Sequence, residues 1–288
     1  KGTETGVSVY LITTGGTIAS KRHNTDPGVV AQVRGYELTT SAGLISDDLR
    51  IIELGVEGSY NFDWDFVTNL LTTVDSVARQ PNCDGIVVTQ GTDTMEETAF
   101  AAYLFNESSV PIVFTGAQRP ADVSDSDGPR NLRNALLAAR STSLNMARSL
   151  VVFGGKVMSG LWAIKRHTID LQPYYSVGGD IGTFDDDGNL LVLNTPRDPK
   201  PLGPLAIRWA QGVLVIPMML GLSDKLFAQL TNSPNVQGVI LEGFGIGNAN
   251  RGVASIVEGL VEQGVPVVVT SRCGDGPTRP LHGHWGGW

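Results

Sequence analysis

The feature that most constrains the fold is an alternation of short apolar runs with longer amphipathic segments. The apolar runs are rich in β-branched residues and nearly continuous, as expected for buried strands of a parallel sheet covered on both faces. Strands are expected over residues 7–13, 85–89, 111–115, 150–153, 212–216, 236–241 and 265–271. Helices are expected over residues 64–78, 96–105, 130–141, 223–230 and 253–263. This pattern predicts an α/β fold with an open, mostly parallel, doubly wound sheet.

Two local signals predict where the chain divides. Asp187-Gly188 separates apolar runs at 181–184 and 190–193, which indicates a β-hairpin. Residues 194–204 then carry four prolines, which exclude a helix or a central strand and favour a linker. A chain of 288 residues is long enough for two domains. We expect a large N-terminal α/β domain over residues 1–190, a linker over 191–212 and a smaller, shortened parallel α/β domain over 213–288.

Charge and composition exclude several classes of partner. A net charge of −8 argues against nucleic-acid or anionic-membrane binding, and no apolar run approaches the length of a membrane span. Cys83 and Cys273 are expected to be two buried structural thiols, and the spacing of a zinc site is absent. His282 and His284 have no matching ligand cluster, so a solvated tail is expected there. We expect a soluble protein without metal or cofactor, in either the cytoplasm or the periplasm.

Hydroxyl and glycine residues follow two of the expected strands, where ligands bind in open α/β sheets. Residues 14–19 read TGGTIA, and Thr17 is either a helix cap or an exposed hydroxyl. Residues 90–98 read QGTDTMEET, which suits a capped helix start. The same segment would aim backbone N–H groups at an oxyanion and offer Asp93 to an ammonium group. Local physics alone favours the cap in both places.

Four other segments contain glycine with polar residues and have structural interpretations. Residues 116–120 read GAQRP, and residues 126–131 read SDGPRN, a turn that enters a helix with Pro129 near its first position. Residues 185–188 read DDDG but lack the spacing of a calcium loop, which leaves a hairpin turn. Residues 243–248 read GFGIGN and lack the third glycine of a dinucleotide fingerprint.

Taken together, these segments resemble the bacterial-type L-asparaginase family of threonine amidohydrolases. The resemblance covers nearly the whole chain and is carried by residues 14–19, 91–98, 115–120, 126–128 and 245–250. It implies hydrolysis of the side-chain amide of L-asparagine to L-aspartate and ammonia. It also implies that Thr17 is the nucleophile and that Thr92, Asp93 and Lys165 form a second catalytic triad.

The resemblance also implies how the substrate is held. Ser59 would bind the α-carboxylate, Asp93 the α-ammonium group, and the backbone of Ala117 would meet the side-chain amide. Asn250 would be contributed across a subunit interface of a homotetramer built as a dimer of dimers. The family's lid usually carries a tyrosine, whereas residues 21–34 contain none, so the base that activates Thr17 is unassigned.

Two alternatives to the asparaginase hypothesis stay open. One is a glutaminase or another amidase of the same fold, because a single methylene separates glutamine from asparagine. The other is a non-catalytic amino-acid-binding relative that has lost turnover. Comparing ammonia release from the two amides separates the first alternative, and ligand binding without ammonia release would indicate the second.

Overall fold

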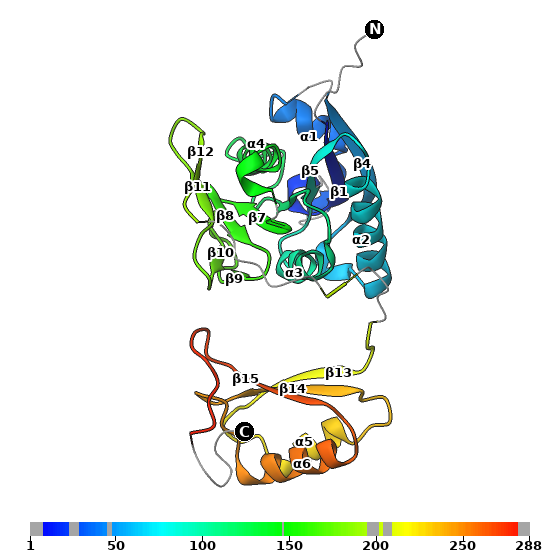
Figure 1. Cartoon of the computed structure of the whole chain (residues 1–288), viewed down its shortest axis with the longest axis vertical. Coiled ribbons are helices and arrows are strands. Elements are labelled where there is room, and N and C mark those ends of the chain that lie inside the picture. The colour runs from blue at the N-terminus through cyan, green and yellow to red at the C-terminus, as the bar shows by residue number, and fades with distance from the viewer. Residues whose placement is uncertain are drawn as a thin grey trace. The chain divides into compact units, whose positions relative to one another are not determined.

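The chain divides into two units. The computed structural model describes residues 8–22, 29–44, 48–145, 147–194, 202–203 and 209–281. The units are Lys1–Ile207 and Arg208–Trp288 (Figure 1). Their division lies within residues 191–212, where the prolines predict a linker, and more than half of that segment lies outside the described residues. The domain bounds therefore stay a prediction.

The large unit is built on an eight-stranded sheet with the order β12-β11-β8-β7-β6-β5-β1-β4. Its strands are β1 (Ser8–Gly15), β4 (Leu49–Glu57), β5 (Cys83–Thr89), β6 (Ile112–Thr115), β7 (Ser149–Phe153), β8 (Lys156–Ser159), β11 (Gly182–Phe184) and β12 (Leu190–Val192). The five strands from β7 to β4 are parallel, and β8, β11 and β12 add an antiparallel edge. The expected mostly parallel α/β sheet is confirmed.

The order of the strands places a ligand site at the ends of β1 and β5. Both β4 and β5 follow β1 in sequence, yet they pair with it on opposite sides. The connection after β1 runs toward β4 at one edge of the sheet, whereas the connection after β5 runs toward β6 in the opposite direction. The two loops therefore diverge, as loops do at a switch point of an α/β sheet. The TGGTIA and QGTDTMEET segments are the loops that follow these two strands.

Helices cover both faces of this sheet (Figure 1). They are α1 (Gly35–Ser41), α2 (Trp64–Ala78), α3 (Met95–Phe105) and α4 (Gly128–Ala139). The Asp63 carboxylate accepts a hydrogen bond from the amide of Phe66 at 2.8 Å and caps α2, which has the expected bounds. Helix α4 begins two residues before the expected start and carries Pro129 in its first turn, as predicted.

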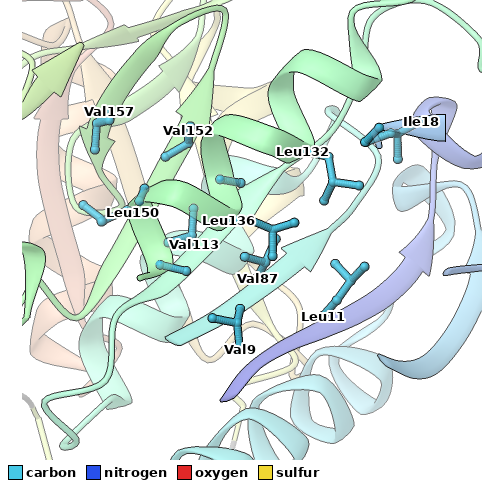
Figure 2. Packing of buried hydrophobic residues seen from close by; sticks show 14 of the residues in the cluster. Val9, Leu11, Ile18, Val87, Val113, Leu132, Leu136, Leu150, Val152 and Val157 are labelled. Atoms are coloured by element: carbon cyan, nitrogen blue, oxygen red, sulfur yellow. The ribbon is translucent and has the colours of Figure 1, made fainter. Parts of the chain in front are cut away.

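The apolar stripe of α4 packs on the sheet and forms the main core. Leu132 and Leu136 of α4 are buried against inward-facing residues of four parallel strands, among them Val87 of β5 and Val113 of β6 (Figure 2). Ile18, directly after Thr17, is part of the same cluster. Burying a side chain of this size stabilises the fold by about 1.5–3 kcal/mol, so the core anchors the TGGTIA loop.

Several short elements were not expected from the sequence. Besides α1, β4 and β8, they are two antiparallel ribbons and three single 3₁₀ turns. The ribbons are β2 (Ser20–Arg22) with β3 (Val29–Ala31) and β9 (Ala163–Lys165) with β10 (Tyr174–Ser176), and the turns are η1 (Thr17–Ala19), η2 (Ser59–Asn61) and η3 (Thr142–Leu144). Strands of three residues are too short to show a periodic pattern. The expected hairpin at Asp187-Gly188 is confirmed, since β11 and β12 pair in antiparallel fashion around it.

The small unit contains a parallel sheet of the order β13-β14-β15. Its elements are β13 (Val213–Pro217), α5 (Asp224–Thr231), β14 (Gly238–Gly243), α6 (Arg251–Glu262) and β15 (Val267–Ser271). Each differs from the expected range by at most about two residues, within the usual uncertainty of element ends. Phe227 of α5 and Val253 of α6 are buried with Leu241 of β14 in one apolar cluster.

The two cysteines differ in environment, and the expectation of two buried thiols is wrong for Cys273. Cys83 is buried at the start of β5, and burial raises the pKa of its thiol to about 11. Cys273 follows the end of β15 and is exposed, and both thiols are free. His282 and His284 lie outside the described residues. In the described part of the chain, no helix is both long and apolar enough to span a membrane.

Candidate active site

The loops that follow β1 and β5 are in direct backbone contact. Gly16 has a φ of 80°, a conformation that side chains other than glycine rarely adopt. A Cβ atom at Gly16 would lie 2.3 Å from the amide nitrogen of Gly91. Glycine at position 16 is therefore required for the close approach that brings Thr17 beside the second loop.

Thr17 begins the 3₁₀ turn η1, and its hydroxyl does not cap it. The N-cap residue is Gly16, without a side-chain hydrogen bond, so the interpretation of Thr17 as a cap is wrong. Ser20 donates its hydroxyl to the Gly16 carbonyl at 2.8 Å, and Ile18 is anchored in the core. Within the described residues, no hydrogen bond involves the Thr17 hydroxyl. The turn is thus held by its neighbours, and its threonine side chain stays available to a ligand.

The second loop links β5 to α3 and is tied to η2. Thr94 is the N-cap of α3 but its side chain does not cap the helix. Instead, its hydroxyl donates to the Ser59 carbonyl at 3.0 Å, and its amide donates to the Ser59 hydroxyl at 3.4 Å. The cap interpretation therefore fails for this hydroxyl too. Glu96 and Glu97 do lie in the first turn of α3, where the helix dipole favours negative charge.

Lys165 joins the second loop from the ribbon β9–β10. Its ammonium group donates to the Thr92 hydroxyl and to the Asp93 carboxylate, both at 2.7 Å. The Lys165 side chain is 16% exposed and that of Asp93 is 55% exposed, so the pair lies at the boundary between protein and solvent. A charged donor at this distance polarises the Thr92 hydroxyl strongly.

A cavity of about 440 Å³ opens at these loops. Its wall contains five of the seven expected site residues, Thr17, Ser59, Thr92, Asp93 and Lys165. Of the remaining two, Ala117 is buried beside the lining residue Gln118, and Asn250 belongs to the small unit. Hydroxyl, carboxylate and ammonium groups that are far apart in sequence thus meet in one hollow, which is the usual arrangement of a small-molecule site.

A buried carboxylate supports the GAQRP turn at the edge of the cavity. Asp127 accepts hydrogen bonds from the amides of Gln118 and Arg119 at 3.1 and 2.9 Å. It also accepts one from the side-chain amide of Asn131 at 3.1 Å. These bonds satisfy backbone donors that would otherwise be costly to bury, and they fix the backbone that follows Ala117.

Comparison with known proteins identifies the family. The model of the asparaginase N-terminal domain matches residues 8–196, and the model of the glutaminase/asparaginase C-terminal domain matches residues 212–286. The chain belongs to the asparaginase family. An L-asparaginase of Bacillus licheniformis is 29% identical, over 96% of this chain and 86% of that protein. A glutaminase-asparaginase of Pseudomonas aeruginosa is 27% identical, over 93% of this chain and 76% of its own length.

A solved structure of the asparaginase family has the same fold. The crystal structure of a probable cytoplasmic L-asparaginase from Campylobacter jejuni superimposes with a TM-score of 0.83 and 24% sequence identity. The match covers 93% of this chain and 84% of that one. At this identity the likeness supports the α/β architecture, and the site must be argued from the residues themselves.

Asn250 is the N-cap of α6. It is the one expected site residue that belongs to the small unit. Its side-chain oxygen accepts from the amide of Val253 at 2.9 Å, and its side-chain nitrogen donates to the carbonyl of Leu222 at 3.0 Å. Each of these atoms can form one further hydrogen bond. The capping function is therefore compatible with a second contact, and the role expected at a subunit interface stays a prediction.

Several residues of the cavity wall were not among the expected site residues, although Gln118 lies in the GAQRP segment. Glu57, Tyr60, Gln118 and Thr168 line the cavity. The only sequence signal that Tyr60 lines the cavity is its position directly after Ser59, an expected substrate-binding residue. Tyr36, the tyrosine nearest to the expected lid, lies in α1, is 64% exposed and is not in the cavity wall. Part of that lid, residues 23–28, lies outside the described residues.

Proposed function

We propose that the chain hydrolyses the side-chain amide of L-asparagine to L-aspartate and ammonia, with the Thr17 hydroxyl as nucleophile. Membership of the asparaginase family makes the chain an amidohydrolase. The main support for asparagine hydrolysis by Thr17 is the position of the Lys165 ammonium group. It contacts both Thr92 and Asp93 in the wall of a cavity that Thr17 also lines.

The first half of the reaction forms an ester on Thr17. Its oxygen attacks the amide carbon, the carbon–nitrogen bond breaks, and the hydroxyl proton leaves with the nitrogen as ammonia. The amide of Thr92 makes no hydrogen bond to another described residue, so it can donate to the oxyanion of the tetrahedral intermediate. Removing one such donor typically costs about 3–4 kcal/mol of transition-state stabilisation.

The second half hydrolyses this ester. A water molecule attacks the ester carbon, aspartate is released, and a proton returns to the Thr17 oxygen. The Thr92 hydroxyl accepts a hydrogen bond from the Lys165 ammonium group at 2.7 Å, which polarises its O–H bond and suits it to hold the attacking water beside the ester. Asp93 balances the positive charge of Lys165 within the same cluster.

The substrate's backbone groups have matching partners in the wall. The Ser59 hydroxyl accepts from the Thr94 amide, which leaves its own proton free to donate to the α-carboxylate. The half-exposed Asp93 carboxylate accepts from the α-ammonium group. The backbone at Ala117, which directly precedes the two amides that the Asp127 carboxylate binds, meets the side-chain amide.

An assay of ammonia release tests this proposal. We expect turnover of L-asparagine, with a value of kcat/KM at least about 10-fold above that for L-glutamine, since one methylene is worth about 1–3 kcal/mol. Glutamine is the matched control because one relative is named a glutaminase-asparaginase. A reversed preference would support the glutaminase alternative. Calorimetric binding of asparagine without ammonia release would support the binding-protein alternative.

We further propose that the chain assembles as a homotetramer, a dimer of dimers with Asn250 at the subunit interface. Closed symmetric assembly is the usual solution for an enzyme whose site lies between subunits. Light scattering on the purified protein is expected to give the mass of four chains. A fully active monomer at assay concentration would contradict the role assigned to Asn250.

A further inference from the structure

The ribbon β9–β10 brings Lys165 to Thr92 although it is not part of the eight-stranded sheet. In this ribbon, Lys165 and Tyr174 are direct partners in the antiparallel register. Side chains of residues that face each other in such a pair project from the same face. Lys165 and Tyr174 therefore both reach the loop that contains Thr92.

Tyr174 binds the backbone of Thr92, and Lys165 binds the side chain of Thr92. The Tyr174 hydroxyl donates to the Thr92 carbonyl at 2.7 Å, and the residue is only 4% exposed. Its ring packs against that of Phe153, with 5.4 Å between the centroids. Thr92 is thus bound at its carbonyl and at its hydroxyl by two residues of one ribbon.

The same bond orients the next peptide group. In a trans peptide, the carbonyl and the following N–H point in opposite directions. Because the Thr92 carbonyl faces Tyr174, the N–H of Asp93 is directed away from Tyr174. No described residue accepts a hydrogen bond from this N–H, and Asp93 lines the cavity. The tyrosine therefore also sets the direction of a donor at the cavity wall.

Glu96 positions Lys165 by binding the backbone of Lys165. Its carboxylate accepts a hydrogen bond from the backbone N–H of Lys165, and Glu96 itself is held in the first turn of α3. Burial and the nearby carboxylates of Glu96 and Asp93 raise the pKa of Tyr174 well above its usual range. The phenol consequently stays protonated and remains a donor under all assay conditions near neutral pH.

We propose that Tyr174 and Glu96 are positioning residues, which together set the distance between the Thr92 hydroxyl and the Lys165 ammonium group. Tyr174 acts through the Thr92 carbonyl, and Glu96 acts through the Lys165 backbone. This inference rests on the proposed roles of Thr92 and Lys165. A displacement of about 1 Å in such a pair is enough to reduce the rate about 100-fold.

Replacing Tyr174 with phenylalanine tests the inference with the smallest change. Tyr174→Phe keeps the ring beside Phe153 and removes only the donor to Thr92. We expect kcat on L-asparagine to fall about 10- to 100-fold, with a smaller change in KM. The matched control is Tyr175→Phe. Tyr175 is the next residue of β10, is 38% exposed and packs under Arg166, so its loss of a hydroxyl leaves kcat unchanged.

Two substitutions of Glu96 provide an independent test. In Glu96→Gln the side-chain oxygen still accepts from the Lys165 amide, so this variant retains most of the rate. In Glu96→Ala the acceptor is lost, and kcat falls by about 10-fold or more. Glu97→Ala is the control in the same helical turn and leaves kcat unchanged. A purely structural role of Glu96 would lower the melting temperature of Glu96→Ala without this difference in kcat between the two Glu96 variants.

The outcomes separate this inference from the proposed function. If the wild type releases ammonia and both Tyr174→Phe and Glu96→Ala match its kcat, the positioning role is overturned while the function stands. If the wild type is inactive, the proposed function fails. Crystal structures of the variants then test the positioning role separately. A separation of Lys165 from Thr92 in Tyr174→Phe would support the positioning role, and a retained 2.7 Å contact would refute it.

Discussion

Thr17→Ala is expected to reduce the rate of ammonia release from L-asparagine by at least about 10⁴-fold. The reason is that the proposed nucleophile is the hydroxyl, and alanine offers none. The free energy of unfolding should change by less than about 0.5 kcal/mol, since no described residue is hydrogen-bonded to that hydroxyl and η1 is anchored by Ile18. Steady-state kinetics together with chemical denaturation measure both quantities.

Thr17→Ser and Thr17→Val are the matched controls for this prediction. Serine keeps a nucleophilic hydroxyl and should retain a measurable part of the rate. Valine keeps the shape of threonine without the hydroxyl and should be as inactive as alanine. An active valine variant would show that position 17 serves only to shape the cavity.

Lys165→Met is expected to reduce kcat by about 10²- to 10⁴-fold. Methionine has nearly the length of lysine but cannot donate to the Thr92 hydroxyl or balance Asp93. Because Asp93 is more than half exposed, water solvates the carboxylate that loses its partner. The fold should therefore be affected far less than the rate, and circular dichroism during heating checks this.

Lys156→Met is the control for the loss of a paired lysine. Lys156 contacts Asp180 at 2.9 Å in a half-exposed ion pair on β8, and it is not in the cavity wall. Pairs of this kind contribute little to stability, about 0–1 kcal/mol. Its kcat should equal that of the wild type. Equal losses in Lys156→Met and Lys165→Met would mean that net charge, rather than the contact with Thr92, governs the rate.

Much of the fold follows from the sequence because its long strands are buried on both faces. The continuous apolar runs of β5 and β7 and the stripe of α4 leave little choice of structure. By contrast, β4 reads LRIIELGVE and alternates only partly, since it is the edge strand and is incompletely buried. Helix α1 was also missed, because its seven residues are too few to show a clear helical period.

The site was partly predictable for a topological reason. Thr17 and Thr92 follow neighbouring parallel strands, so the rule that ligands bind at strand ends brings their loops together. Lys165 was identified only by resemblance, because β9 has three residues and its partner strand is not evident from the sequence. The bond from Tyr174 to Thr92 depends on the register of that ribbon, which no local pattern reveals.

A crystal structure of the protein with bound L-aspartate tests the central claim, the role of Thr17, most directly. We expect the Thr17 oxygen to lie about 3–3.5 Å from the side-chain carboxyl carbon of the ligand, on the face opposite to Thr92. We also expect the α-carboxylate to contact Ser59 and the α-ammonium group to contact Asp93. A ligand whose side-chain carboxyl group contacts Thr92 while Thr17 lies beyond about 5 Å would contradict the role of Thr17 as nucleophile.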